Sequence, residues 1–175
     1  IAEARKYVDE SMREAKAAKN VDDELRALMI AGRIDVAEGK FDDGERRFRN
    51  VLERARTSIS TTAEAHGRLA QLYEKRGNFS AAREQFRQML EKAFEARESI
   101  DDMQLRFPFF TAVSELLNAY VDFLGARGQW VDALAITEAS RAQTLGEVMP
   151  DIGKTRDVRA IARDTGATIL CYWLE

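Results

Sequence analysis

The chain has 175 residues, of which 45% are hydrophobic, and its formal net charge at pH 7 is −3. Nucleic-acid binding usually needs a basic face, so this charge gives no reason to expect a nucleic-acid partner. The sequence has no run of 18 apolar residues, the approximate length that spans a bilayer, and no charged-then-apolar leader. We therefore expect no membrane span and a cytoplasmic location.

The first part of the chain predicts helices separated by polar breaks. Apolar residues recur at spacings of three, four and seven, which is the pattern of an amphipathic helix. We predict helices over residues 2–19, over about 23–38, and from Asp42 to near Thr57. The segment Gly39-Lys40-Phe41 is the predicted turn before the third helix. Asp42 and Glu45 have the spacing of a capping box at its start.

The stretch from His66 to Leu90 contains the clearest pattern in the chain. One helix face is formed by Leu69, Ala70, Leu72 and Tyr73, and Gly77-Asn78 then interrupts the run. A second helix follows, and Thr61 and Glu64 suggest a capping box at the start of the first. Small residues stand beside large ones, as two closely packed antiparallel helices require. We expect burial of Phe48, Tyr73, Phe86 and Leu90, with Ala82 at a close helix contact.

This stretch resembles a tetratricopeptide (TPR) repeat, whose signature is a Leu-Ala/Gly pair, Tyr, Gly, an aromatic residue, Ala and Phe at these spacings. An earlier unit matches at an offset of 38 residues, compared with about 34 in a standard TPR. Asp35 stands where that unit should have Tyr. A third, looser unit at an offset of 51 carries Gly128, Trp130 and Ala133.

The extra residues of the third unit lie between Ala93 and Pro108. Phe94 stands where the family usually has a closing Pro, so we expect the helix from Ser80 to continue past Ala96. Pro108 suits the first position of the next helix. The apolar stripe of that helix is predicted to comprise Phe109, Val113, Leu116, Leu117, Tyr120 and Leu124.

The last part of the chain changes character. Residues 131–148 predict a helix, 150–154 a loop and 156–163 a short helix. Residues 167–174, ATILCYWL, have the alternation of a β-strand that is apolar on both faces. Residues 130–174 resemble the junction between TPR arrays and the CHAT domain, a caspase-like cysteine-peptidase domain. We expect the strand to continue into a sheet beyond Glu175. The alternatives are that two chains pair through residues 167–174 or that the segment folds back onto the helices.

No catalytic, metal or cofactor site is predicted. His66 is the sole histidine and is assigned to packing, and Cys171 behaves as a small buried hydrophobe. The acidic pairs Asp42-Asp43 and Asp101-Asp102 lack the alternating oxygen ligands of a calcium loop. Five arginines are interleaved with acids, which predicts a solvated helix face: Arg46, Arg47, Arg49, Arg54 and Arg56.

The predicted fold is all-α: a TPR-like solenoid of antiparallel helix pairs in a right-handed superhelix, with one terminal β-strand. We expect a TPR-like domain over 1–148, and over 149–175 a linker with the first elements of a truncated CHAT-like domain. In TPR arrays the first helix of each pair lines a concave groove. The groove positions expected to hold a protein or peptide are Arg26, Met29, Arg33, Gln71, Glu74, Lys75, Asn118 and Asp122.

The predicted function is a non-catalytic protein-interaction scaffold that needs no cofactor. The alternative for the groove residues is that they are merely solvated. The alternative function is the N-terminal regulatory or substrate-recruiting fragment of a CHAT-type cysteine peptidase whose active site lies beyond residue 175. The two functions are compatible if the chain is the recruiting arm of that enzyme.

Overall fold

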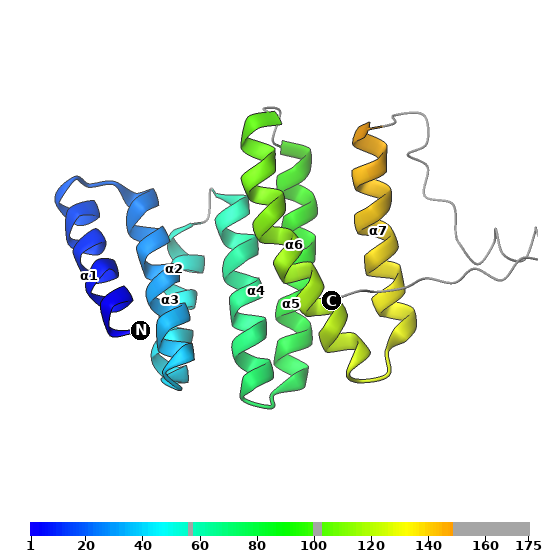
Figure 1. Cartoon of the computed structure of the whole chain (residues 1–175), viewed down its shortest axis with the longest axis horizontal. Helices are drawn as coiled ribbons and strands as arrows, with labels where there is room; N and C mark the ends of the chain where they lie inside the picture. The colour runs from blue at the N-terminus through cyan, green and yellow to red at the C-terminus, as the bar shows by residue number, and fades with distance from the viewer. Residues whose placement is uncertain (56–57, 100–102, 149–175) are drawn as a thin grey trace, which may run out of the picture. The chain divides into compact units, whose positions relative to one another are not determined.

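A computed structural model describes residues 1–55, 58–99 and 103–148. These residues form seven helices and no strand: α1 (Ala2–Ala17), α2 (Val21–Ala37), α3 (Phe41–Arg54), α4 (Ile59–Lys75), α5 (Phe79–Ser99), α6 (Met103–Gly125) and α7 (Trp130–Val148) (Figure 1). The described part of the protein is therefore all-α. None of its helices is both long and apolar enough to cross a membrane. The predicted loop, short helix and strand of residues 149–175, with Cys171, lie outside the described residues, as do Arg56, Thr57 and the acidic pair Asp101-Asp102.

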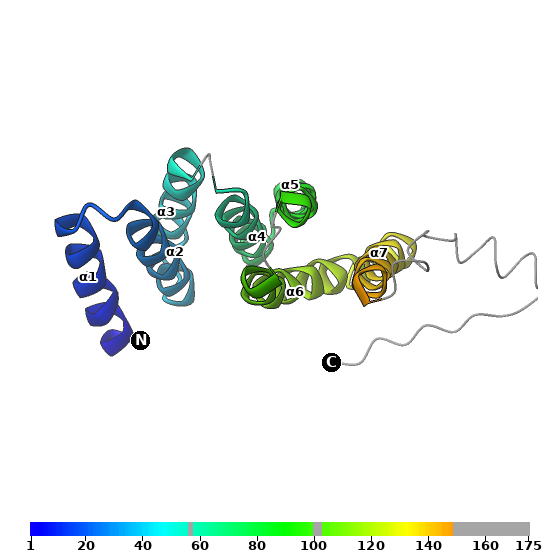
Figure 2. The same cartoon turned by 90° about the horizontal axis from the view of Figure 1, so that it is seen from above.

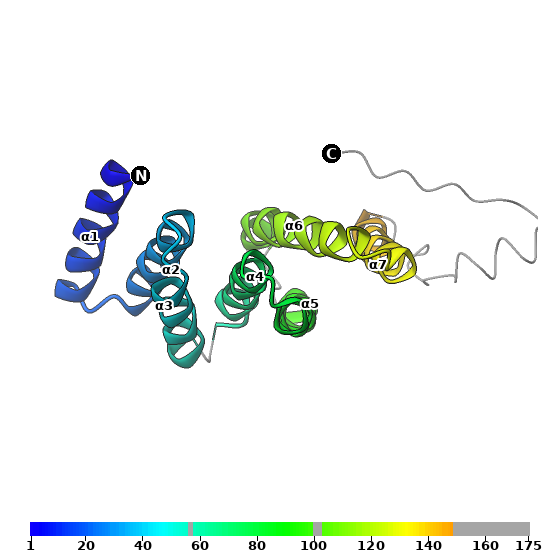
Figure 3. The ribbon, with the colours of Figure 1, turned by 90° about the horizontal axis from the view of Figure 1, so that it is seen from below.

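Helices that follow one another in the chain pack side by side from α1 to α5. Figures 2 and 3 show α2 beside α3 and α4 beside α5 when these helices are viewed nearly end on. Ile1–Phe123 form one compact unit, and Leu124–Glu175 form a second, which contains α7. The repeated unit of the first is a pair of antiparallel helices joined by a short turn, so this part of the chain is repeat-like.

The same turn geometry recurs after α1, α2, α4 and α6. Each turn has one residue with positive φ: Lys19 (53°), Gly39 (76°), Gly77 (74°) and Gly128 (70°). The next residue donates its backbone N–H to a carbonyl five residues earlier, as in Asn78 to Tyr73 at 2.9 Å and Gln129 to Leu124 at 3.0 Å. These are Schellman-type helix ends, in which glycine avoids the strain of a left-handed backbone. The predicted glycine turns at Gly39, Gly77 and Gly128 are confirmed.

The helix starts differ from the sequence prediction in two places. α3 begins at Phe41 after Lys40, and Glu45 binds Tyr73 and Arg76 on the next helix pair instead of capping. The Asp42–Glu45 capping box is therefore wrong. α4 begins at Ile59 after Ser58, so the Thr61–Glu64 box is also wrong. In both cases the spacing signalled a cap, but the helix starts upstream of it.

The long fifth helix is confirmed, whereas the position of Pro108 is not. α5 continues to Ser99, past Ala96 as predicted. α6 begins at Met103, which places Pro108 inside the helix and not at its first residue. Proline has a helical φ, but inside a helix it lacks the N–H that would bond the carbonyl four residues earlier, and its ring crowds that carbonyl. The missing hydrogen bond lies in the N-terminal part of α6.

The core of the first unit follows the predicted pattern. Phe48, Phe86 and Ala82 are at most 1% exposed and Tyr73 is 7% exposed, while Leu90 is only half-buried. α6 packs on α5 through Tyr120, whose ring stacks on that of Phe86 at a centroid distance of 4.8 Å. Gly32 lets α2 approach α3, since a Cβ there would lie 2.6 Å from Cε1 of Phe48. Bulk thus fills the space left by small residues.

Candidate functional site

Two hollows lie along α2, α4 and α6. The α2–α4 hollow, of about 690 Å³, is lined by Asp22, Leu25, Arg26, Met29, Ile30, Arg33, Ser58, Ser60, Thr61 and Glu64. The α4–α6 hollow, of about 420 Å³, is lined by Arg33, Val36, Phe48, Arg68, Gln71, Glu74, Lys75, Glu115, Ala119 and Asp122. Arg33 belongs to both hollows. Their walls therefore come mainly from the first helix of each pair.

Most of the predicted groove residues lie at these two hollows. Arg26, Met29 and Arg33 line the first, and Arg33, Gln71, Glu74, Lys75 and Asp122 line the second. Asn118 is exposed on α6 but lines neither hollow, and Met29 is buried with only 4% of its surface exposed. Helical spacing places these residues on one face, because positions three, four and seven apart share a helix side.

An ion pair crosses the α4–α6 hollow. Arg68 Nη1 donates to Glu115 Oε1 at 2.9 Å, and Nη2 donates to Oε2 at 3.4 Å. The Arg68 side chain is 7% exposed and that of Glu115 is 56% exposed. The hydrogen bonds from Arg68 lower the pKa of Glu115 below its ordinary value, and the field of Arg33 acts in the same direction. Neither residue was among the predicted groove residues. No local pattern in the sequence signals this pair, because Glu115 is 47 positions away from Arg68. The i,i+4 spacing of Glu64 and Arg68 indicates only a second, local acidic neighbour of Arg68.

Three other charged groups of this hollow have uncommitted side chains. Arg33, Lys75 and Asp122 make no hydrogen bond or ion pair with any residue of the described part. All three are exposed. A charged side chain that is fixed by no internal partner can pair with a ligand without first breaking another contact. The hollow thus presents both signs of charge to an incoming chain.

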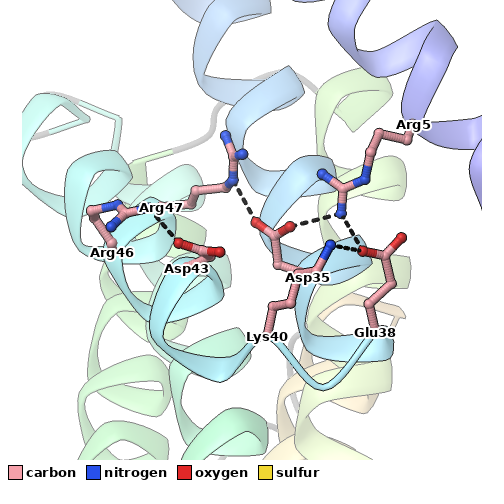
Figure 4. A network of polar contacts seen from close by, with 7 residues as sticks. All are labelled: Arg5, Asp35, Glu38, Lys40, Asp43, Arg46 and Arg47. Atoms are coloured by element: carbon pink, nitrogen blue, oxygen red, sulfur yellow. Dashed lines mark hydrogen bonds and ion pairs between the residues drawn. The ribbon is translucent and has the colours of Figure 1, made fainter.

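The opposite side of α2 is held by a buried carboxylate (Figure 4). Asp35, whose side chain is 2% exposed, accepts from Arg5 of α1 at 2.7 Å and from Arg47 of α3 at 2.5 Å. Burial alone would raise the pKa of Asp35, but the bonds from Arg5 and Arg47 outweigh it and the pKa lies below its ordinary value. The position at which the sequence departs from the repeat pattern therefore ties three helices together.

A second polar network connects α3 to α4. The Tyr73 hydroxyl donates to Glu45 at 2.6 Å and accepts from Arg49 at 2.8 Å, and Arg76 donates to Glu45 at 2.7 Å. Arg54 pairs with Glu24 of α2 through two bonds, at 3.0 Å and 2.5 Å. The arginines of α3 were predicted to form a solvated face. That prediction is wrong for Arg47 and Arg54, which are committed to ion pairs between helices and are each only 33% exposed.

Other chemistry finds little support within the described residues. No group of three or more His, Cys, Asp or Glu side chains among them could hold a metal ion. His66 is half-buried, and its Nδ1 lies 2.9 Å from Gln85 Oε1 on α5. Burial lowers the pKa of His66 below 6.5. This geometry fits the packing role that we expected for His66.

No family model matches the chain, and no curated protein is significantly similar to it.

Proposed function

We propose that this chain is a TPR-like solenoid that acts as a non-catalytic scaffold and binds a protein or peptide segment. The binding surface is the pair of hollows along α2, α4 and α6. The observation that supports it best is that seven of the eight groove residues proposed from the sequence line these hollows. Repeat proteins commonly bind extended partners on the surface that successive first helices form.

The shape and the charges of the surface favour a peptide over a small cofactor. The two hollows share Arg33, so one extended segment can cross both. Their walls mix polar and apolar side chains, and three of the charged groups are uncommitted. Affinity on such a surface comes from a few anchoring contacts surrounded by many weak ones.

Charge reversal in the hollow tests this proposal. Peptides that bind the full chain are first selected from a random displayed library, and their affinities are then measured by titration. Lys75→Glu and Arg33→Glu should each change affinity by about tenfold or more. Each substitution reverses the charge that faces the peptide, and like charges that face each other across an interface are strongly unfavourable. The free energy of unfolding should change by less than about 0.5 kcal/mol, since both side chains are exposed.

Arg46→Glu is the matched control. Arg46 is also an exposed cation, but it lies on α3 in a separate hollow of about 370 Å³ formed by Asp42, Glu45, Arg46, Arg49, Asn50 and Glu53. Its reversal should leave peptide affinity unchanged. If Arg46→Glu changes affinity while Lys75→Glu and Arg33→Glu do not, the binding surface lies on α3 and the proposal is wrong.

A further inference from the structure

Arg68 is an unusual wall residue for an open hollow. Its guanidinium is almost fully buried, with 7% of the side chain exposed, yet it lines the α4–α6 hollow. Buried guanidinium groups need an acceptor for each donor, because an unpaired donor in the interior costs free energy. The site is therefore built to hold a negative charge against Arg68.

The carboxylate that pairs with Arg68 in this structure, that of Glu115, is only partly fixed. Glu115 reaches Arg68 from α6, a different helix, and its own side chain is 56% exposed. The second bond of the pair is long, at 3.4 Å. Glu64 lies farther from Arg68, at 3.5 Å, and Gln71 accepts from Nη1 at 3.2 Å. Because the Glu115 carboxylate is half-exposed, it keeps part of its contact with water and can turn toward solvent at modest cost. The buried Arg68 then needs another acceptor in its place.

One hydrogen-bond donor of Arg68 has no acceptor within the described residues. Its Nε is buried and has no hydrogen-bond partner within the described residues, although Nη1 and Nη2 both donate hydrogen bonds. Glu115 therefore does not complete the acceptor set of Arg68. Two further cations, Arg33 and Lys75, line the same hollow without internal ion pairs in the described part.

We infer that Glu115 occupies the place of a partner's carboxylate on Arg68, so that a peptide segment with an acidic side chain binds the hollow by displacing Glu115. This inference rests on the proposed function and specifies its partner as an acidic segment. The incoming carboxylate takes the hydrogen bonds of Nη1 and Nη2, and a neighbouring acidic residue pairs with Arg33 or Lys75. The displaced Glu115 remains near Arg33, whose charge already acts on it. Binding is thus opposed by an internal competitor.

The competing explanation is that Glu115 only ties α6 to α4. The Glu115→Gln variant distinguishes the two explanations, because it keeps the size of the side chain and removes its charge. Two probes are used with the full chain at low salt: a labelled peptide with three consecutive glutamates and blocked termini, and the same peptide with three glutamines. Glu91→Gln is the matched control, since Glu91 on α5 is 61% exposed and lines neither hollow.

Removal of the competitor should raise the affinity of Glu115→Gln for the glutamate peptide by about two- to fivefold over wild type, which is the effect of releasing a half-exposed ion pair. Glu91→Gln should match wild type, and the glutamine peptide should bind all three proteins equally. The Arg68 Nε–H resonance should shift when the glutamate peptide binds. Arg68→Lys should weaken binding of the glutamate peptide selectively, with its folding verified by circular dichroism.

The inference is overturned if Glu115→Gln binds the glutamate peptide no more tightly than Glu91→Gln does. A loss of stability in Glu115→Gln without any gain in affinity would identify Glu115 as a structural tie. If library-selected peptides still respond to Lys75→Glu in that case, only the acidic preference falls and the proposed function stands. If no peptide binds either hollow, both are overturned.

Discussion

Asp35 and Tyr73 occupy equivalent places in two successive helix pairs, 38 residues apart, and each bonds an arginine of α3. Asp35 pairs with Arg47 at 2.5 Å, and Tyr73 accepts from Arg49 at 2.8 Å. The two side chains differ in chemistry, but both use a buried oxygen to fix α3 to a neighbouring helix. The departure from the repeat pattern thus preserves a function of the position.

Asp35→Asn should destabilise the protein by about 2–3 kcal/mol, because it removes a buried charge from between two guanidinium groups. The cost is below that of a fully buried pair, since Arg5 and Arg47 retain 27% and 33% exposure. Urea unfolding followed by circular dichroism measures the change. Asp43→Asn, which removes the exposed partner of Arg46, is the control and should cost less than about 0.5 kcal/mol. Equal effects would show that Asp35 is not a structural centre.

Phe86→Ala should cost about 3–5 kcal/mol, because Phe86 is fully buried and stacks against Tyr120. Phe79→Ala provides the same chemical change on the same helix at a residue that is 50% exposed, and should cost about 1 kcal/mol or less. Chemical unfolding of both variants gives the comparison. An unchanged unfolding midpoint for Phe86→Ala would mean that α5 does not pack in this register.

The pH dependence of stability should contain a contribution from His66. Burial lowers its folded pKa below the unfolded value of about 6.5, so the unfolded chain binds the proton more readily. Stability should therefore fall as the pH drops from about 7 through the lowered pKa. His66→Gln should flatten this part of the profile, as measured by urea unfolding between pH 7.5 and 5.5. The same slope in both proteins would refute the contribution. Asp35, with its depressed pKa, titrates at lower pH and does not enter this window.

The sequence predicted the helices and their turns well, because both depend on local patterns. Apolar spacing located the helix faces, and Gly39, Gly77 and Gly128 marked backbones that need positive φ. The predicted caps failed at Glu45 and Glu64, because the same spacing of an acid after a polar residue also occurs within a helix.

The polar contacts between helices could not be predicted from one sequence. Arg68 and Glu115 are 47 positions apart, and Arg5 and Asp35 are 30 apart, so no local pattern connects them. In the sequence, Asp35 only departs from the repeat pattern, because its partners Arg5 and Arg47 lie on other helices. The groove residues were easier to place, since helical periodicity alone assigns them to one face of α2, α4 and α6.

Mapping of a bound peptide by amide chemical shifts tests the central claim most directly. A library-selected peptide is titrated into the isotope-labelled full chain, and the shifted amides are assigned. We predict that the largest changes cluster at the two hollows, around Arg33 on α2, Gln71 and Lys75 on α4, and Asp122 on α6. Changes concentrated instead around Arg46 and Asn50 on α3, with the hollows unaffected, would contradict binding along the first helices.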